Sequence, residues 1–346
     1  MVDLLVYNFS IQSHAGPYLV EFDNNLKGSH KLANMGTHYI IDANVYDMCG
    51  PIDTKNIVII DATEETKSYQ GIIPIIEKLI DQGLKRDSRL VAIGGGITQD
   101  ITCFIANTYM RGVSWSFVPT TLLAQADSCI GSKSSINFGS IKNLLGSFTP
   151  PNHVIISDQW LTTLDEKDIS SGIGEIIKLY LIAGELIGAG TIRSNLPYHI
   201  HQTLKIKQHY IEQDEFDKGI RNILNYGHCF GHGIETATNF IIPHGIAVSI
   251  GMDIANKFAV NDNLITLEQY QQMHAVLLSN YKEYANVAVN IEQVLNALTK
   301  DKKNTQGKIN IILPEGTTIK KQGFVNSEEF WTKARTAIAQ TLITLY

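Results

Sequence analysis

The first half of the chain alternates short apolar runs, rich in β-branched residues, with longer amphipathic stretches. The predicted strands are His38–Ile41, Ile57–Ile60, Leu90–Ile93, Trp115–Val118 and Val154–Ser157. Between them, the stretch Tyr69–Gln82 repeats apolar residues at helical spacing and ends near Gly83. Strands that alternate with helices indicate a parallel sheet covered by helices and joined by right-handed crossovers.

From about Asp165 onward, apolar residues recur mainly at helical spacing. The predicted helices are Ile169–Ala183, Tyr198–Glu212, Ile220–Ala237, Gly245–Val260, Leu267–Ala285, Ile291–Thr299 and Ser327–Thr344. A short β-like run, Lys308–Leu313, precedes Pro314. We therefore predict an α/β + α fold: a Rossmann-like parallel-sheet domain over residues 1–164, then a mostly helical domain over residues 165–346. Ligand pockets favour such domain junctions.

Composition narrows the class of protein. The chain has 346 residues, of which 44% are hydrophobic and 18% charged, as in an ordinary globular protein long enough for two domains. A formal net charge of -6 argues against nucleic-acid binding by general electrostatics. The four cysteines lack metal-type CxxC spacing, and no signal peptide or long apolar run is visible. We expect a cytoplasmic protein with reduced cysteines and no membrane association.

A run of three glycines, Gly94–Gly96, directly follows the predicted strand Leu90–Ile93 and opens a helix-like stretch. Glycines at such a turn let the backbone approach a phosphate, and the helix start supplies N–H donors. The run is therefore a candidate cradle for a dinucleotide pyrophosphate, although its spacing is not GxGxxG. The alternative is a tight turn that merely needs glycine.

Residues 111–143 are dense in polar groups. Lys133, Lys142 and Asn143 lie near glycines, which suits an anionic substrate; the alternative is a solvated loop. Residues 131–134 resemble the end of a P-loop, but position 126 is alanine where that motif needs glycine, which excludes it.

Residues 221–252 contain three histidines in a pattern that packing alone does not require. His228 and His232 are four apart and share one helix face, while His244 lies between Pro243 and Gly245, at the predicted start of another helix. Such imidazoles can form a divalent-metal site. Glu175, with Lys178 one turn later, is the best carboxylate to supplement or replace one of them. The alternative is ordinary helix histidines.

These motifs, in this order, resemble the 3-dehydroquinate synthase family of sugar phosphate cyclases, over nearly the whole chain. The matching stretches are EETK, GGGITQD, RGVSWSFVPTTLLAQADSCIGSK, KNLLGSF, SGIGEIIK, RNILNYGHCFGHGIE, HGIAVSIGM and DKKNTQGK.

The resemblance implies roles for individual residues. The implied ligands of zinc, with cobalt as the alternative metal, are Glu175, His228 and His244. The implied NAD site consists of Asp42, Asn44, Glu64, Lys67, Gly95, Gly96, Asp100, Thr120, Thr121, Asp127, Lys142, Trp160 and Thr163. The implied substrate-binding and catalytic groups are Lys133, Asn143, Lys178, Lys207, Arg221, Asn225, His232, Lys302 and Lys303. Arg111 matches an arginine that reaches the neighbouring subunit's phosphate site, which implies a homodimer.

The resemblance also implies a reaction of the shikimate pathway, in aromatic amino acid biosynthesis. A phosphate-eliminating lyase would convert 3-deoxy-D-arabino-heptulosonate 7-phosphate to 3-dehydroquinate and phosphate. NAD would oxidise a hydroxyl whose pKa the metal lowers, phosphate would leave, the hydride would return, and an aldol step would close the ring. We expect lysine and arginine side chains to surround such a doubly anionic sugar phosphate.

Some positions depart from the family pattern. GGK reads Gly131-Ser132-Lys133, residues 134–137 are altered, and Ile246 replaces a glutamate beside the metal ligand His244. A sibling cyclase that acts on another sugar phosphate is therefore the alternative function. A metal-dependent polyol dehydrogenase and a non-catalytic paralogue are less favoured, because the first does not need these lysines and the second does not need a metal site.

Overall fold

The computed structural model describes residues 7–23, 36–50, 52, 54–139, 141–300, 304 and 307–343. Contacts divide the chain into two compact units. Unit 1 comprises Met1–Leu164 with Gln208–Phe216, and unit 2 comprises Asp165–Lys207 with Asp217–Tyr346. The segment Gln208–Phe216, predicted as part of the helical domain, thus groups with the sheet.

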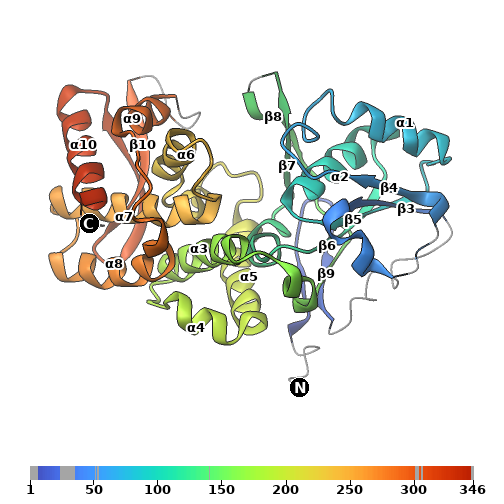
Figure 1. Ribbon diagram of the computed structural model, residues 1–346, viewed down its shortest axis with the longest axis horizontal. Helices are drawn as coiled ribbons and strands as arrows, with labels where there is room; N and C mark the ends of the chain where they lie inside the picture. Colours follow the sequence, from blue (N-terminus) through green and yellow to red (C-terminus); the bar gives the residue numbers. More distant parts are fainter. Residues whose placement is uncertain are drawn as a thin grey trace. The chain divides into compact units, whose positions relative to one another are not determined.

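Unit 1 is organised, in its described residues, on a seven-stranded sheet (Figure 1). The strand order is β1 (Phe9–Ile11), β2 (Tyr18–Phe22), β9 (His153–Ile156), β6 (Ser114–Pro119), β5 (Arg89–Gly94), β3 (Thr37–Asp42) and β4 (Ile57–Ile60). Neighbouring strands pair in parallel except β1 with β2. The strand β3 is buried along its whole length, as expected for a parallel sheet covered on both faces. The predicted parallel sheet is confirmed.

Helices cover this sheet. The helix α2 (Gly96–Thr108) packs against β3, β5 and β6, and α1 (Ile73–Asp81) packs against β4. The helix α1 begins later than the predicted Tyr69, because Pro74 occupies its first turn and proline disrupts a helix interior. The shorter helical segments are η3 (Ala43–Cys49), η4 (Thr54–Asn56), η5 (Tyr109–Arg111), the π-helix η6 (Ala124–Ser128) and η7 (Asp158–Thr163).

The polar stretch after residue 132 forms an antiparallel hairpin of β7 (Lys133–Phe138) and β8 (Ile141–Phe148), which the sequence did not predict as strands. Its β7 strand packs against α2. Ser134, Ile136 and Asn137 are buried there, so polar side chains occupy positions that an apolar pattern would normally mark. The strands β1, β2 and β11 and the helix α4 were also not predicted.

Unit 2 is mostly helical and centres on α7 (His244–Asn261). Its other elements are α3 (Glu166–Ile182), α4 (Ala189–Ser194), α5 (Leu196–Gln213, in unit 2 up to Lys207), η8 (Ile220–Asn225), α6 (His228–Ala237), α8 (Leu267–Tyr281), η9 (Lys282–Tyr284), α9 (Ile291–Thr299), β10 (Lys308–Glu315), β11 (Thr318–Val325) and α10 (Glu328–Ile343). The helix α7 packs against α3, α6, α8, α10 and β10 (Figure 1). It is buried on nearly every face, which explains why its sequence is apolar all round.

The prediction of one helix over Ile220–Ala237 is wrong. The chain forms η8, breaks at Tyr226 and Gly227, and starts α6 at His228. Gly227 has φ +78°, a left-handed conformation that glycine adopts readily and that interrupts a helix. The break makes His228 the first residue of a helix.

Glycines let α7 approach two of its neighbours closely. A Cβ atom on Gly174 of α3 would overlap the carbonyl oxygen of Gly245, and one on Gly245 would overlap the carbonyl oxygen of Ser171. Ser171 Oγ also accepts a hydrogen bond from the Gly245 N–H at 2.9 Å. On the other side, a Cβ on Gly251 would overlap the carbonyl oxygen of Gly227. Backbone therefore packs directly on backbone at both contacts.

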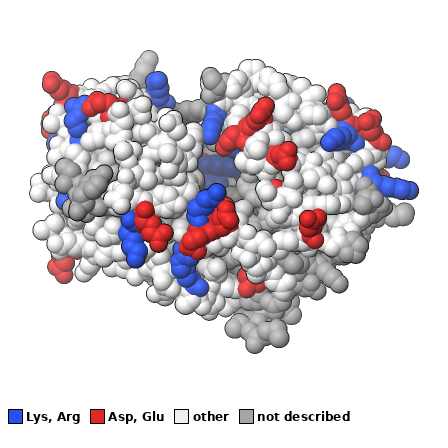
Figure 2. Space-filling model, viewed as in Figure 1, with Lys and Arg blue, Asp and Glu red and all other residues white. Residues whose placement is uncertain are grey.

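Charged side chains of both signs lie on the surface. On the face that Figure 2 shows, acidic and basic side chains are interspersed among uncharged residues. Within the described part of the chain, no helix has both the length and the apolar character to cross a membrane.

Replacing Gly174 by alanine tests the α3–α7 contact. We expect Gly174→Ala to lower the free energy of unfolding by roughly 1–3 kcal/mol, because the new methyl group forces two backbones apart. Gly190→Ala in α4 is the matched control: no atom lies within 4 Å of its added Cβ, and alanine favours a helix. Chemical denaturation measures both changes. Equal effects of the two substitutions would contradict the close contact.

Candidate functional site

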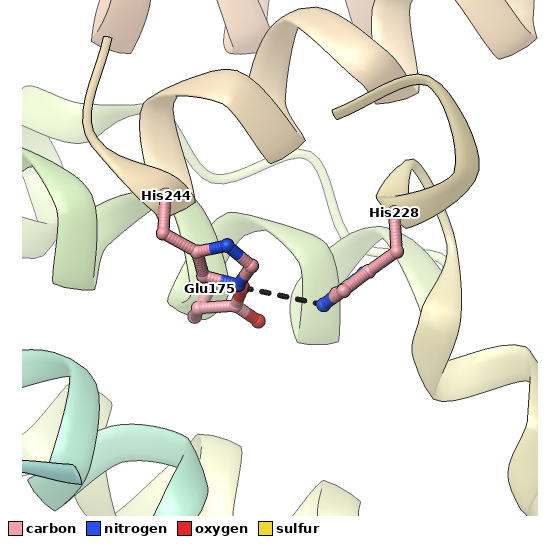
Figure 3. A group of neighbouring side chains, drawn as sticks. All are labelled: Glu175, His228 and His244. Carbon is pink, nitrogen blue, oxygen red and sulfur yellow. Dashed lines mark ion pairs between the residues drawn. The ribbon is translucent and has the colours of Figure 1, made fainter. Parts of the chain in front are cut away.

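Three side chains from three helices converge in unit 2 (Figure 3). Glu175 lies in α3, His228 is the first residue of α6, and His244 is the first residue of α7. Glu175 Oε1 lies 3.7 Å from His228 Nε2 and 3.4 Å from His244 Nε2. The ligand atoms of all three residues lie within 4.8 Å of one another.

This donor set fits a divalent metal. Zinc binds histidine nitrogen and carboxylate oxygen at about 2.0–2.2 Å, so two ligands of a tetrahedral site lie about 3.3 Å apart. The two distances to Glu175 Oε1 are close to that value. Two histidines and one glutamate leave a fourth position for substrate, as in catalytic zinc sites. These residues could therefore hold one metal ion.

The carboxylate of Glu175 also pairs with Lys178, which lies one turn later in α3. Lys178 Nζ forms an ion pair with Glu175 Oε2, and both side chains are almost fully buried, at 3% and 2% exposure. Oε1 faces the two histidines while Oε2 faces the lysine. A buried pair of this kind is costly to break, because removing one partner leaves a buried charge. The geometry thus fixes which oxygen points toward the candidate metal position.

Hydrogen bonds at the far side of each ring orient the two histidines. His228 Nδ1 lies 3.2 Å from the carbonyl oxygen of Tyr226, which can only accept, so Nδ1 carries a proton. His244 Nδ1 lies 3.1 Å from Glu235 Oε2. Both arrangements direct Nε2 toward Glu175. Partners of this kind fix ring orientation in metal sites.

The electrostatics of His244 reflect its two carboxylate neighbours. Burial alone would lower the pKa of His244, but hydrogen bonds to Glu175 and Glu235 outweigh burial and raise the pKa to about 10. The imidazole is therefore held as a cation between two glutamates when no metal is bound, and a metal would take the place of that proton.

Glu235 was missed as a functional candidate, although it lies three residues after His232 in the HGIE stretch that matched the family. Helical spacing from His232 was the signal that could have found it. The structure also shows that Ile246 is fully buried in unit 2. A carboxylate for His244 is thus supplied by α6, despite the missing glutamate at position 246.

His232 belongs to a second, overlapping group. His232, Glu235 and His244 also offer ligand atoms within 4.8 Å of one another, and the rings of His232 and His244 stack at 5.8 Å. Glu235 already engages His244 Nδ1, however, and His232 is exposed. The group with the buried Glu175 is therefore the better metal site, with His232 beside it.

Replacing His244 separates metal binding from packing. We expect His244→Ala to lose bound metal while keeping its fold, because the side chain lies at the start of a helix and is 35% exposed. Metal content after dialysis and thermal unfolding of the same sample measure both effects. His209→Ala, at an exposed helix histidine that bonds Gln213 in its own helix, is the control and should keep the metal. Full metal content in His244→Ala would refute the site.

In unit 1, polar candidates gather at the carboxyl ends of three adjacent parallel strands. Asp42 ends β3, Gly94 ends β5, and Thr120 follows β6. In the sheet, β4 lies on one side of β3, at the edge, whereas β6 lies on the opposite side of β5. The connections after β3 and after β5 therefore run in opposite directions, and the strand order reverses between these two strands. Ligands of open α/β sheets bind at such a switch point.

The glycine turn has the features of a phosphate cradle. Gly95 caps α2 and Gly96 is its first residue, so N–H groups of the first turn face outward. A Cβ on Gly95 would approach Thr121 Cγ2 to 2.9 Å, so a side chain there would crowd the turn. Nearby, Asp42 Oδ1 accepts hydrogen bonds from Asn44 N and Nδ2, both at 3.0 Å.

Five predicted residues form one polar network in unit 1. Lys67 Nζ lies 3.2 Å from Asp100 Oδ2 and donates to Asn143 Oδ1 at 2.9 Å. Lys142 Nζ lies 3.5 Å from Glu64 Oε1. The hairpin joins this network, because the Ser135 N–H donates to Asp100 Oδ1 at 3.1 Å. The polar hairpin is therefore tied to α2 and to the turn after β4.

Asp100 is the most strongly perturbed carboxylate of this network. Burial raises its pKa to about 6, against the opposing effect of the Lys67 ammonium. A folded-state pKa above the ordinary value means that the folded protein holds a proton that the unfolded chain has released. The stability contribution of this proton is present below about pH 4 and is lost as the pH rises through 6.

Comparing pH profiles tests this assignment. We expect the stability of the wild type relative to Asp100→Asn to decrease from pH 4 to pH 7, with a slope of at most about 1.4 kcal/mol per pH unit. Denaturant unfolding at each pH measures the difference. Parallel profiles for the two proteins would contradict the raised pKa.

The remaining candidates lie at other places in the two units. Trp160 is buried in the hydrophobic core with Tyr39 and Ile41, and Thr163 Oγ1 contacts Met48 Sδ at 3.3 Å. The other placements are Asp127 in η6, Lys133 at the start of β7, Lys207 buried in α5, Arg221 buried in η8, Asn225 at the end of η8 and Arg111 exposed at the end of η5. Lys302 and Lys303 lie outside the described residues.

Profiles of known families match most of the chain. The profile described as "3-dehydroquinate synthase N-terminal" matches residues 57–171, and that described as "3-dehydroquinate synthase C-terminal" matches residues 172–304. A curated 3-dehydroquinate synthase from Alkaliphilus metalliredigens (strain QYMF) is 36% identical over 288 residues, covering 80% of each chain.

Solved structures share the fold at lower identity. A 2-deoxy-scyllo-inosose synthase complexed with carbaglucose-6-phosphate, NAD+ and Co2+ has a TM-score of 0.83 at 22% identity, covering 96% of this chain and 99% of that one. Glycerol dehydrogenase from Schizosaccharomyces pombe has a TM-score of 0.59 at 17% identity, covering 97% and 90%. The predicted fold class is confirmed. By TM-score, this chain resembles the 2-deoxy-scyllo-inosose synthase more closely than the glycerol dehydrogenase.

Proposed function

Because this chain belongs to the 3-dehydroquinate synthase family, we propose that it is an enzyme converting 3-deoxy-D-arabino-heptulosonate 7-phosphate to 3-dehydroquinate and phosphate. This is a phosphate-eliminating lyase reaction of the shikimate pathway. The observation that carries the proposal is the convergence of Glu175, His228 and His244, because the oxidation that would begin this reaction needs a metal-activated hydroxyl.

A bound divalent metal, zinc or cobalt, would supply a Lewis acid for a substrate hydroxyl, and bound NAD would supply a reversible hydride acceptor. Glu175, His228 and His244 would hold the metal. The switch point with Asp42, Gly95 and Gly96 would hold the dinucleotide, with the N–H groups of α2 at its pyrophosphate.

The other residues of the chain bind and orient the anionic substrate. Near the metal ligands, Lys178 is a buried cation. His228 and His244 each begin a helix, so the positive ends of two helix dipoles lie beside the metal ligands. Holding the substrate in one orientation contributes much of the catalysis in a reaction of several steps. The proposed substrate-binding side chains are Lys133, Asn143, Lys207, Arg221, Asn225, His232, Lys302 and Lys303.

We also infer that the protein works as a cytoplasmic homodimer. The family resemblance of Arg111 supports this inference, since its side chain is exposed at the end of η5, where it is available to a neighbouring subunit. Sedimentation at micromolar concentration would detect the dimer, and a monomer that turns over at the full rate would refute the role given to Arg111.

A sibling cyclase is the second candidate. Ser132 stands where the family pattern has glycine, and the fold matches a 2-deoxy-scyllo-inosose synthase closely. A polyol dehydrogenase is disfavoured, because such an enzyme would not need the buried Lys178 beside the metal ligands. A polyol dehydrogenase would also release reduced cofactor, which an assay can detect.

The direct test follows phosphate and reduced cofactor together. We expect the protein, supplied with NAD, zinc and the heptulosonate phosphate, to release phosphate in many turnovers without net absorbance at 340 nm, because the hydride returns to the product. A coupled dehydratase would report dehydroquinate in the ultraviolet.

The alternatives give different readouts. Stoichiometric growth of absorbance at 340 nm would indicate a dehydrogenase. If protein shown to hold zinc and NAD releases no phosphate, the proposed substrate is wrong, and sedoheptulose 7-phosphate and glucose 6-phosphate are the next substrates to assay.

A further inference from the structure

The carboxylate of Glu215, just after α5, is the centre of a polar junction in unit 1. Ser132 Oγ donates to Glu215 Oε1 at 2.5 Å, and the His14 N–H donates to Glu215 Oε2 at 2.7 Å. His14 Nδ1 lies 3.1 Å from Oε1. Only 11% of the Glu215 side chain is exposed. Burial alone would raise the pKa of Glu215, but the hydrogen bonds from Ser132 and His14 outweigh it and lower the pKa, so the group stays ionised.

Ser132 occupies a backbone conformation that suits glycine. Its φ is +66°, in the left-handed region that non-glycine residues avoid. The family pattern has glycine at this position, where the conformation is free of that cost. In this chain, the hydrogen bond from Ser132 Oγ to an ionised carboxylate holds the turn, and charge-assisted bonds of this kind are among the stronger ones.

The turn sets the position of Lys133, the first residue of β7. On one side of Lys133 is Ser132, which bonds Glu215; across the hairpin, Lys133 pairs with Phe148. The Phe148 ring packs against Phe216 with ring centroids 5.2 Å apart. The adjacent residues Glu215 and Phe216 thus contact the residue before Lys133 and the cross-strand partner of Lys133.

We propose that Glu215 is a positioning residue for substrate binding, which acts through Ser132 to fix the direction of Lys133 toward a phosphorylated, doubly anionic sugar. The inference rests on the proposed function, in which Lys133 binds an anionic group of the substrate. Ser132 and Glu215 together do what glycine does in the family pattern. In this proposal the serine at position 132 is a compensated substitution.

Three substitutions separate the hydrogen bond from the backbone conformation. Ser132→Ala removes the bond and keeps the unfavourable conformation, whereas Ser132→Gly removes the bond but adopts the conformation readily. Glu215→Gln keeps the shape, but its amide nitrogen cannot accept a hydrogen bond, so Ser132 and His14 compete for one oxygen.

We expect Ser132→Ala and Glu215→Gln to raise KM for the sugar phosphate about tenfold, with kcat within about twofold, because the loss affects ground-state and transition-state binding alike. Ser132→Gly should stay within about threefold of the wild-type KM. The matched control is Glu212→Gln, three residues earlier, which accepts from the Gln12 N–H at 2.8 Å and does not contact Ser132. Its KM should not change.

Steady-state kinetics and thermal unfolding of the same variants decide the outcome. A lower unfolding midpoint with unchanged KM in Ser132→Ala and Glu215→Gln would show a merely structural junction and overturn the proposal. An equal rise of KM in Ser132→Gly or in Glu212→Gln would also overturn it. Wild-type turnover in the same assay tests the proposed function separately, so failure of the function and failure of the positioning role remain distinguishable.

Discussion

The close packing of α7 on α3 and α6 is the contact on which the candidate metal centre depends. Each metal-ligand candidate adjoins a glycine of that contact: Glu175 follows Gly174, His228 follows Gly227, and His244 precedes Gly245. Because no side chain separates the backbones, the three ligands come within the distance that one metal ion can bridge. Helix packing and metal binding are therefore two consequences of the same residues.

Both clusters contain charges that a stable core would avoid. In unit 2, Glu175 and Lys178 are buried as a pair, and His244 lies between two carboxylates. In unit 1, burial keeps the pKa of Asp100 near 6 beside Lys67. Such groups cost stability in the free protein, and strongly perturbed ionisable groups gather at functional sites. A bound metal and a bound anion would compensate these charges, so we expect the ligands to stabilise the protein.

Much of this arrangement could be predicted from the sequence. The central strands follow from continuous apolar runs, because a parallel sheet is buried on both faces. The Gly94–Gly96 turn follows from its place after a strand, and the spacing of His228 and His232 indicated a shared helix face. Residue types alone left open which histidines would be ligands; the family resemblance proposed Glu175, His228 and His244, and the structure brings these three together.

Other features depend on contacts that a linear pattern does not contain. The β7–β8 hairpin has polar residues such as Ser134 and Asn137 in buried positions, so it has no alternating apolar signal. The break at Gly227 inside an apparently continuous helix arises from its left-handed conformation and its packing on α7. The helical spacing of Glu235 from His232 was a sequence signal, but its role beside the His244 ring is visible only in the structure. In each case the deciding partner lies far away in the sequence or on another element.

The candidate metal centre requires that one ion binds where α3, α6 and α7 meet. Anomalous X-ray diffraction from crystals of the zinc-loaded protein, collected on either side of the zinc absorption edge, would locate this ion. We expect one strong peak about 2.0–2.2 Å from Glu175 Oε1, His228 Nε2 and His244 Nε2. A peak bound by His232 and Glu235 instead, or no peak near Glu175, would contradict it.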